Sequence, residues 1–239
     1  MTRPAATTYL LRHAPSAYSV DYRVNGDPAV DVPLTSDGVA ECRVARWAVP
    51  SENLGTCVTS AFGRCIRTAE WVVAGRAEVY VDPRLNELDY GAFEGAAFLD
   101  YARWLIEHGP HVRPPGAGES QTEGIERMLA GLRGVLERPG PRLVVAHGLL
   151  VSVIQWAQAF PQQSLTEVFL PPAPCLKPVL IDDEELQVLT GWLLCDLASA
   201  QDRGWHVDLG VFPREAQAAL ATVGTHASAN RDEDEATHA

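Results

Sequence analysis

The chain has 239 residues, of which 46% are hydrophobic and 21% charged, enough for one large domain or two small ones with a buried core. The formal net charge of −12 excludes nucleic-acid binding through a broad basic surface, so an anion would have to be held by a small local cluster of positive groups. No run approaches the roughly 18 consecutive apolar residues of a membrane-spanning helix, and we expect none.

The first half of the chain alternates apolar runs with amphipathic segments, the pattern of strands connected by helices. Thr35 is a favourable N-cap residue, and Pro50 marks the end of the helix that follows it. The expected elements are, in chain order, a strand at 7–11, a turn-rich loop at 14–33, a helix from 35 to about 49, a strand at 56–60, a helix at 63–74, a strand at 78–81 and an acid-rich loop at 83–95.

The second half repeats this alternation up to about residue 160 and then becomes less regular. The expected elements are an amphipathic helix at 98–107, a loop at 112–120, a helix at 121–137, a clear buried strand at 142–146, a helix at 149–159, an edge strand at 179–181 and a helix at 183–199. Strands alternating with helices predict an α/β fold: a three-layer α/β/α sandwich with a mostly parallel central sheet. Functional groups in such sheets gather at the carboxyl ends of the strands.

The five cysteines form no CxxC pair, and the N-terminal MTRPAATT lacks the apolar core of a secretory signal. These features favour a reducing compartment, and we expect a cytoplasmic protein that uses its cysteines as small apolar residues. The last residues, 225–239, are polar and acidic and are expected to be disordered.

Five chemically active side chains follow the expected strands at the points where the strands end. Arg12 and His13 follow the first strand, Arg64 follows the second, Glu87 lies in the loop after the third, and His147 follows the fourth. Taken singly, each has an ordinary structural interpretation: a solvated arginine, a loop acid or a core histidine. Because the carboxyl ends of parallel strands meet at one edge of a sheet, the repeated pattern instead predicts one site.

The group suits phosphate chemistry. Guanidinium groups clamp phosphoryl oxygens with charge-assisted hydrogen bonds, and a neutral imidazole is a good nucleophile toward phosphorus. A second imidazole can donate to phosphoryl oxygens, the backbone N–H of Gly148 at a helix N-terminus favours an anion, and a carboxyl group can protonate the leaving oxygen. Two histidines and an acid could alternatively bind zinc, but two adjacent guanidinium groups would repel the cation. We therefore expect neither a metal nor a cofactor.

Six motifs together resemble the histidine phosphatase superfamily, also called the phosphoglycerate mutase-like fold, over residues 7 to about 160. They are LLRHA, PLTSDG, TSAFGRCIRTAE, LNELDYGAFEG, PGAGES and VVAHG. The resemblance implies a single domain over 1–224 with a cap-like insertion at about 92–120.

The resemblance also implies a role for each residue of the group. His13 would be the nucleophile that becomes phosphorylated, and Glu87 the proton donor that later activates water. The phosphate pocket would consist of Arg12, Arg64 and His147.

Further positions are implied at the edge of this pocket. The resemblance places Asn25, Gly26 and Tyr90 against the substrate. The chain departs from the family in having Ala14 where a glycine usually follows the nucleophile, and Ser19 where an asparagine commonly helps to hold the phosphate. We expect Ser19 at the rim of the pocket.

The insertion bears on the choice between hydrolysis and phosphoryl transfer. Between Gly95 and Glu119 the sequence offers Arg103 and Arg113 as arginines, whereas the mutases that this chain resembles have a longer insertion with further arginines for a carboxylate and a second phosphate. We therefore expect hydrolysis of a small phosphomonoester through a phosphohistidine. A phosphoglycerate mutase-type phosphotransferase and a non-catalytic phosphoryl-binding module are the alternatives.

Two features leave alternatives open. The first is a set of large apolar side chains on the helix expected at 98–107. They either cap the pocket for an apolar or aromatic substrate or pack the helix onto the body; the residues are Phe98, Tyr101, Trp104 and Leu105. The long segment 160–224 either shapes a family-specific pocket or forms a homodimer contact. Apart from the small-molecule substrate, we expect no nucleic-acid or membrane partner.

Overall fold

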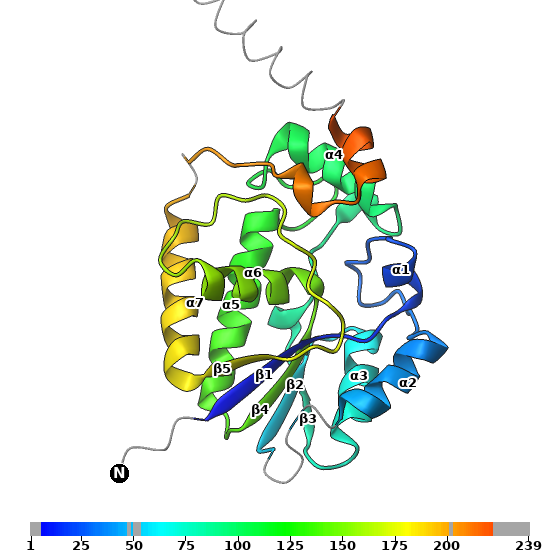
Figure 1. The fold of residues 1–239 in the computed structure, drawn as a ribbon, viewed down its shortest axis with the longest axis vertical. Coiled ribbons are helices and arrows are strands. Elements are labelled where there is room, and N and C mark those ends of the chain that lie inside the picture. The colour runs from blue at the N-terminus through cyan, green and yellow to red at the C-terminus, as the bar shows by residue number, and fades with distance from the viewer. Residues whose placement is uncertain (1–5, 47–48, 50–53, 201–202, 222–239) are drawn as a thin grey trace, which may run out of the picture.

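A five-stranded sheet forms the centre of the computed structural model, which describes residues 6–46, 49, 54–200 and 203–221 (Figure 1). The order of the strands across the sheet is β3-β2-β4-β1-β5. All neighbouring strands are parallel except β5, which runs antiparallel to β1 at the edge. The strands are β1 (Thr7–Arg12), β2 (Thr56–Thr59), β3 (Val79–Val81), β4 (Arg142–Ala146) and β5 (Val179–Asp182).

Helices cover both faces of the sheet, which gives the expected three-layer α/β/α arrangement (Figure 1). The α-helices are α1 (Ala17–Val20), α2 (Ser36–Ala45), α3 (Gly63–Val73), α4 (Phe98–His108), α5 (Gln121–Gly134), α6 (Gly148–Ala159) and α7 (Asp183–Ala198). Short 3₁₀ helices lie at Pro83–Leu85, Gly91–Phe93, Val135–Glu137 and Leu209–Val211, and residues 214–221 are helical.

The alternation of side chains along the strands divides the core into two clusters. In β1, Leu10 packs with α5, α6 and α7 on one face, whereas Leu11 packs with α2 and α3 on the other. All five residues of β4 are buried, as a strand between two parallel neighbours and two helical layers requires. Burial of these apolar faces fixes the register of the sheet, since a slip by one residue would exchange the two faces.

Two local features differ from the sequence-based expectation. The short helix α1 lies within the loop expected at 14–33, and the Ser19 hydroxyl accepts from the N–H of its N-cap residue Ser16. Helix α2 ends at Ala45, before the expected end near 49, and the backbone N–H of Arg46 donates to the Cys42 carbonyl in its last turn. Pro50 and the tail at 225–239 lie outside the described residues.

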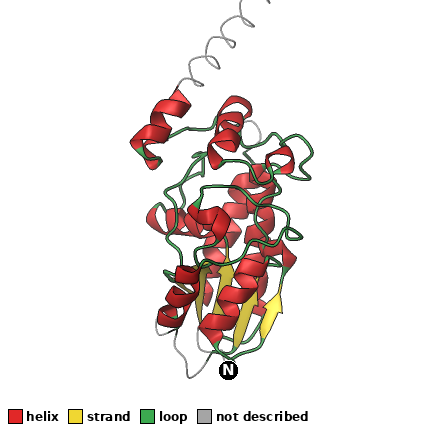
Figure 2. Cartoon of the chain, turned by 90° about the vertical axis from the view of Figure 1, so that its right-hand side faces the viewer, coloured by secondary structure: helices red, strands yellow, loops and turns green. Residues whose placement is uncertain are grey.

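The carboxyl ends of the parallel strands face a thick layer of loops and short helices (Figure 2). This layer includes α4 and residues 203–221 (Figure 1). Within it, Phe212 packs against Phe98 of α4 and against Phe169, so this part of the long segment is bound to its own chain. No helix among the described residues combines the length and the hydropathy needed to cross a membrane.

Candidate active site

The parallel pairing of β1 with β4 brings two histidines together at the carboxyl edge of the sheet. Arg12 lies opposite Ala146, and the backbone N–H of His13 donates to the Ala146 carbonyl over 2.9 Å. His147 follows directly, so the two imidazole rings lie 5.5 Å apart, centre to centre. Residues 134 positions apart thus meet because the strands that carry them are neighbours.

The hydrogen bonds of His13 leave one ring nitrogen unprotonated, as a base or nucleophile requires. Its Nδ1 lies 2.7 Å from the carbonyl oxygen of Ala14, and an acceptor there requires that the proton sit on Nδ1. Nε2 then carries a lone pair, and Arg64 Nε donates to it over 3.2 Å. Burial lowers the pKa of His13 well below its ordinary value, and the neighbouring Arg64 and Arg12 guanidinium groups lower it further. Burial and the two guanidinium groups thus favour the neutral imidazole.

Arg64 lies between the two histidines. It belongs to the first turn of α3, is 5% exposed, and donates through Nη2 to His147 Nδ1 over 3.3 Å. The same guanidinium group bonds Asn25, through Nη1 to the side-chain oxygen and through Nη2 to the carbonyl oxygen at 3.2 Å. A guanidinium group held on several sides keeps its fork in a fixed orientation for an anion.

Arg12 retains an unused donor at the site. Its Nη1 donates to the Ala173 carbonyl over 2.8 Å, but its buried Nε has no hydrogen-bond partner among the described residues. A Cβ atom on Gly148 would lie 3.3 Å from this Nε, so glycine leaves room for the guanidinium group at the start of α6. The unpaired donor and the N-terminal N–H groups of α6 together suit an anion.

His147 is wholly buried at the N-cap of α6. Because Arg64 donates to its Nδ1, the ring proton is on Nε2, which lies 2.9 Å from the Ser60 hydroxyl. Burial, followed by the charge of Arg64, lowers the pKa of His147 well below its ordinary value. The ring is thus a fixed neutral group beside the anion pocket.

Glu87 completes the group as a largely buried carboxyl group. Its side chain is 13% exposed, and its Oε2 lies 3.8 Å from His147 Nδ1. Burial raises the pKa of Glu87 above its ordinary 4.5, although Arg64 opposes the shift. The loop that carries it is fastened by Arg127 of α5, which donates to the carbonyl oxygens of Asn86 (2.9 Å) and Glu87 (3.1 Å). A carboxyl group with a raised pKa, held in this way, can donate a proton.

Glu94 fastens the loop that contains Asn25 and Gly26. Its carboxylate accepts from Asn25 Nδ2 (2.8 Å) and from the backbone N–H groups of Gly26 (2.6 Å) and Asp27 (3.1 Å). Gly26 is required here because a Cβ atom would lie 2.0 Å from the Leu88 carbonyl oxygen. Asn25 therefore reaches Arg64 from a loop whose position is set by close packing and three hydrogen bonds.

Two further predicted residues lie outside the group of hydrogen-bonded side chains. The hydroxyl of Ser19 is used locally, accepting from the Ser16 N–H and donating to the Ser16 carbonyl. Tyr90 is buried edge-on against the ring of Tyr101, 4.9 Å between centres, and burial raises the pKa of its hydroxyl well above the ordinary value. Tyr90 thus packs behind the site near Glu87.

Cys65 lies close to His147 but cannot serve as the nucleophile at neutral pH. Its Sγ is 3.6 Å from His147 Nε2 and 3.6 Å from the Ala146 carbonyl oxygen. Burial raises the pKa of the thiol to about 12, so it stays protonated.

The aromatic side chains of α4 pack among themselves. Tyr101 and Trp104 stack at 6.2 Å, and Phe93 contacts both rings. Leu105 is fully buried in the same core. Packing of the helix onto the body, one of the two expectations, is therefore the arrangement observed.

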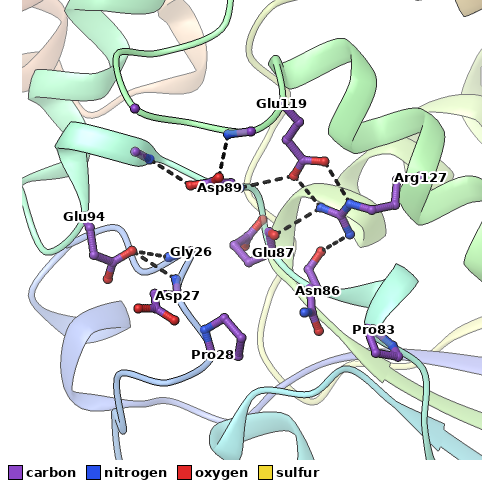
Figure 3. A pocket seen from close by; sticks show the side chains of 13 residues that line it. Gly26, Asp27, Pro28, Pro83, Asn86, Glu87, Asp89, Glu94, Glu119 and Arg127 are labelled. Carbon is purple, nitrogen blue, oxygen red and sulfur yellow. Dashed lines mark hydrogen bonds and ion pairs between the residues drawn. The ribbon is translucent and has the colours of Figure 1, made fainter.

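A cavity of about 600 Å³ opens beside Glu87 (Figure 3). Its walls come from three loops, near residues 26–28, 83–94 and 116–119, and from Arg127 of α5. Acidic, amide, glycine and proline residues line it, and none of its lining residues is aromatic. Glu87 belongs both to this cavity and to the histidine–arginine group, so the cavity adjoins the reactive centre.

Sequence reasoning did not identify Ser60, Arg127, Glu119 or Ala173 as parts of the site. Ser60 lies within the TSAFGR motif and could have been found there, directly after β2. Arg127 lies in the middle of a helix, and Glu119 pairs with it at 2.6 Å. No local pattern distinguishes these residues from solvated surface charges.

Comparison with known proteins shows the family to which the chain belongs. The chain matches the histidine phosphatase superfamily (branch 1) over residues 8–190. It is 33% identical over 171 residues to the probable phosphoglycerate mutase GpmB of Proteus mirabilis (strain HI4320), which covers 66% of this chain and 78% of that protein.

Solved structures show the same fold. YhfR of Bacillus stearothermophilus superposes with a TM-score of 0.61 at 27% identity, over 73% of this chain and 90% of that one. A mycobacterial glucosyl-3-phosphoglycerate phosphatase, Rv2419c, superposes with a TM-score of 0.52 at 25% identity, over 62% of this chain and 76% of that one. The chain belongs to the histidine phosphatase superfamily, which confirms the family and the fold expected from its motifs.

Proposed function

We propose that the protein is a phosphomonoester hydrolase that acts through a phosphohistidine. His13 Nε2 attacks phosphorus, and an N–P bond forms as the P–O bond to the leaving alcohol breaks. Glu87 gives its proton to the leaving oxygen. The resulting Glu87 carboxylate then takes a proton from water as the water oxygen attacks phosphorus. An O–P bond forms while the N–P bond to His13 breaks, which releases inorganic phosphate and restores both side chains.

The observation that carries this proposal is the state of the two reacting side chains. His13 presents an unprotonated Nε2, and Glu87 is held in a buried position that raises its pKa. Arg12 and Arg64 supply positive charge for the phosphoryl oxygens, and Arg12 has an unpaired buried donor. A module that only binds phosphoryl groups has no need of a nucleophile and an acid in these states.

Hydrolysis, rather than phosphoryl transfer between phosphoglycerates, is supported by how the nearby arginines are used. A mutase has to hold the carboxylate of its substrate with a free cationic group. Here Arg103 pairs with Asp100 on the surface, and Arg113 pairs with Glu123. Arg127 forms two hydrogen bonds to Glu119, at 2.8 and 2.6 Å. These guanidinium groups are already neutralised by carboxylates.

The purified protein is therefore expected to release inorganic phosphate from simple esters such as nitrophenyl phosphate and glycerol phosphate. We expect negligible interconversion of 2- and 3-phosphoglycerate, with or without 2,3-bisphosphoglycerate. Phosphate release and isomer exchange should be followed in the same samples. Efficient interconversion that depends on the bisphosphate would reverse the assignment in favour of a mutase.

We also propose that the reaction needs no metal ion. Arg12 and Arg64 supply the positive charge that a metal supplies in other phosphatases, and no group of three or more His, Cys, Asp or Glu side chains in the described part of the chain is arranged to hold one. Turnover of nitrophenyl phosphate should be unchanged after dialysis against excess chelator. Loss of activity that is restored by adding back zinc or magnesium would contradict this proposal.

A cytoplasmic location accords with the thiols of the protein. All five cysteines are free, and Cys195 is exposed, an arrangement suited to a reducing compartment.

A further inference from the structure

The cavity beside Glu87 is the place for the alcohol part of the ester, given the proposed function. The general acid must reach the leaving oxygen, and Glu87 is the residue shared by the reactive group and the cavity (Figure 3). At about 600 Å³, the cavity lies within the range of roughly 300–1,000 Å³ that is usual for small-molecule pockets. Its lining therefore selects the leaving group.

Acidic side chains outnumber basic ones in the lining of the cavity. Besides Glu87 it contains Asp27, Asp89, Glu94 and Glu119, and Arg127 is its single basic residue. Arg127 is paired with Glu119, so the other three carboxylates have no basic partner among the described residues. Asp89 accepts from the N–H groups of Gly91 and Gly118, and Glu94 from those of the 25–27 loop, contacts that hold the loops but leave the negative charges in place.

Asp27 is the carboxylate most open to a ligand. It is exposed at the cavity, and its Oδ1 accepts from the Ala29 N–H over 2.8 Å. Its Oδ2 has no partner among the described residues. A carboxylate accepts hydrogen bonds and cannot donate them, so it favours hydroxyl or ammonium groups and opposes another carboxylate.

We infer that the natural substrate is a phosphomonoester whose alcohol part carries hydroxyl or amino groups and no carboxylate, and that Asp27 is a determinant of this selection. The inference concerns the charge and the hydrogen-bonding groups of the alcohol. It rests on the proposed function, because it takes Glu87 as the acid that protonates the alcohol leaving into this cavity.

The test compares kcat/KM for three small esters that differ in the charge of the alcohol: phosphoethanolamine, glycerol 1-phosphate and 3-phosphoglycerate. The unmodified protein should hydrolyse the first two more efficiently than the third. Asp27→Asn should raise the efficiency for 3-phosphoglycerate relative to phosphoethanolamine by about three- to tenfold, and Asp27→Lys by more, since one or two unit charges change within several ångströms of the ligand. Glu70→Gln removes the same charge from the exposed surface of α3 and should leave the ratio unchanged.

The possible outcomes distinguish failure of this inference from failure of the proposed function. If nitrophenyl phosphate is not hydrolysed, the proposed function fails and the inference fails with it. If nitrophenyl phosphate is hydrolysed but 3-phosphoglycerate is the best of the three esters, the inference alone is overturned. An unchanged ratio in both Asp27 variants, or an equal change in Glu70→Gln, would also overturn it. Because Asp27 is exposed, the variants should fold, which thermal unfolding can check.

Discussion

Replacing His13 by alanine should lower turnover of nitrophenyl phosphate by roughly a thousandfold or more, because the substitution removes the atom that forms the bond to phosphorus. The other residues of the site remain, and Arg12 and Arg64 can still bind the ester. Binding without turnover is therefore expected. The loss should appear in kcat, and a denaturing quench during turnover should trap a labile phosphoryl-enzyme in the unmodified protein and none in His13→Ala.

The fold should tolerate this change. His13 follows Arg12, the last residue of β1 that pairs with β4, so the substitution leaves the pairing of the two strands unchanged. Circular dichroism should match that of the unmodified protein, and His206→Ala, at an exposed histidine, should retain full activity. Retention of a tenth or more of the activity by His13→Ala would exclude a covalent mechanism through this residue.

Replacing Glu87 by glutamine should have the second-largest effect, and the effect should depend on the leaving group. An alkoxide is a poor leaving group and needs a proton in the transition state, whereas a nitrophenolate needs little help. Glu87→Gln should lower turnover of an alkyl phosphate by roughly 10²–10⁴-fold, the usual range for lost acid catalysis. The loss should be clearly smaller for nitrophenyl phosphate when phosphorylation of His13 limits the rate.

The pH dependence of hydrolysis is a second test of proton donation by Glu87. Burial raises the pKa of Glu87 above 4.5, and donation requires the protonated form. Hydrolysis of an alkyl phosphate by the unmodified protein should therefore decline as the pH rises through the pKa of Glu87. Glu87→Gln should lack this decline, because glutamine does not titrate in this range.

Control variants distinguish proton donation from a general loss of charge. Glu107→Gln, at an exposed position on α4, should behave as the unmodified protein does. Equal losses for alkyl and nitrophenyl phosphate in Glu87→Gln, with a pre-steady-state burst test showing that phosphorylation is limiting, would argue against proton donation by Glu87. Glu94 and Asp89 are then the candidates to test, although both carboxylates accept hydrogen bonds from loop N–H groups.

The order of strands and helices was open to prediction because each element has a local signature. The RLVVA run of β4 and the apolar end of β1 are short, continuous and bounded by turn residues, as buried parallel strands are. Boundaries were less predictable. Pro50 suggested a longer helix than α2, and the turn of α1 depends on a hydrogen bond between Ser16 and Ser19 that the turn-rich composition of its loop did not indicate.

The reactive group was predictable as a set of residue types at strand ends, because parallel topology places all carboxyl ends at one edge. The convergence of Arg12, His13, Arg64, Glu87 and His147 could therefore be predicted from the residue types and their spacing. Tertiary structure alone decided the state of each group. The proton on His13 Nδ1 depends on the position of the Ala14 carbonyl, and the raised pKa of Glu87 depends on burial by elements distant in sequence.

The surroundings of the reactive group were likewise decided by packing. Whether the aromatic residues of α4 face a pocket or one another depends on where the helix lies, and Tyr101 and Trp104 stack together. Whether Arg127 is a free cation depends on a partner, Glu119, from outside its own helix. Local sequence determines which charges exist, but only the folded chain determines which of them remain unpaired beside the leaving group, since pairing is a matter of distance and burial.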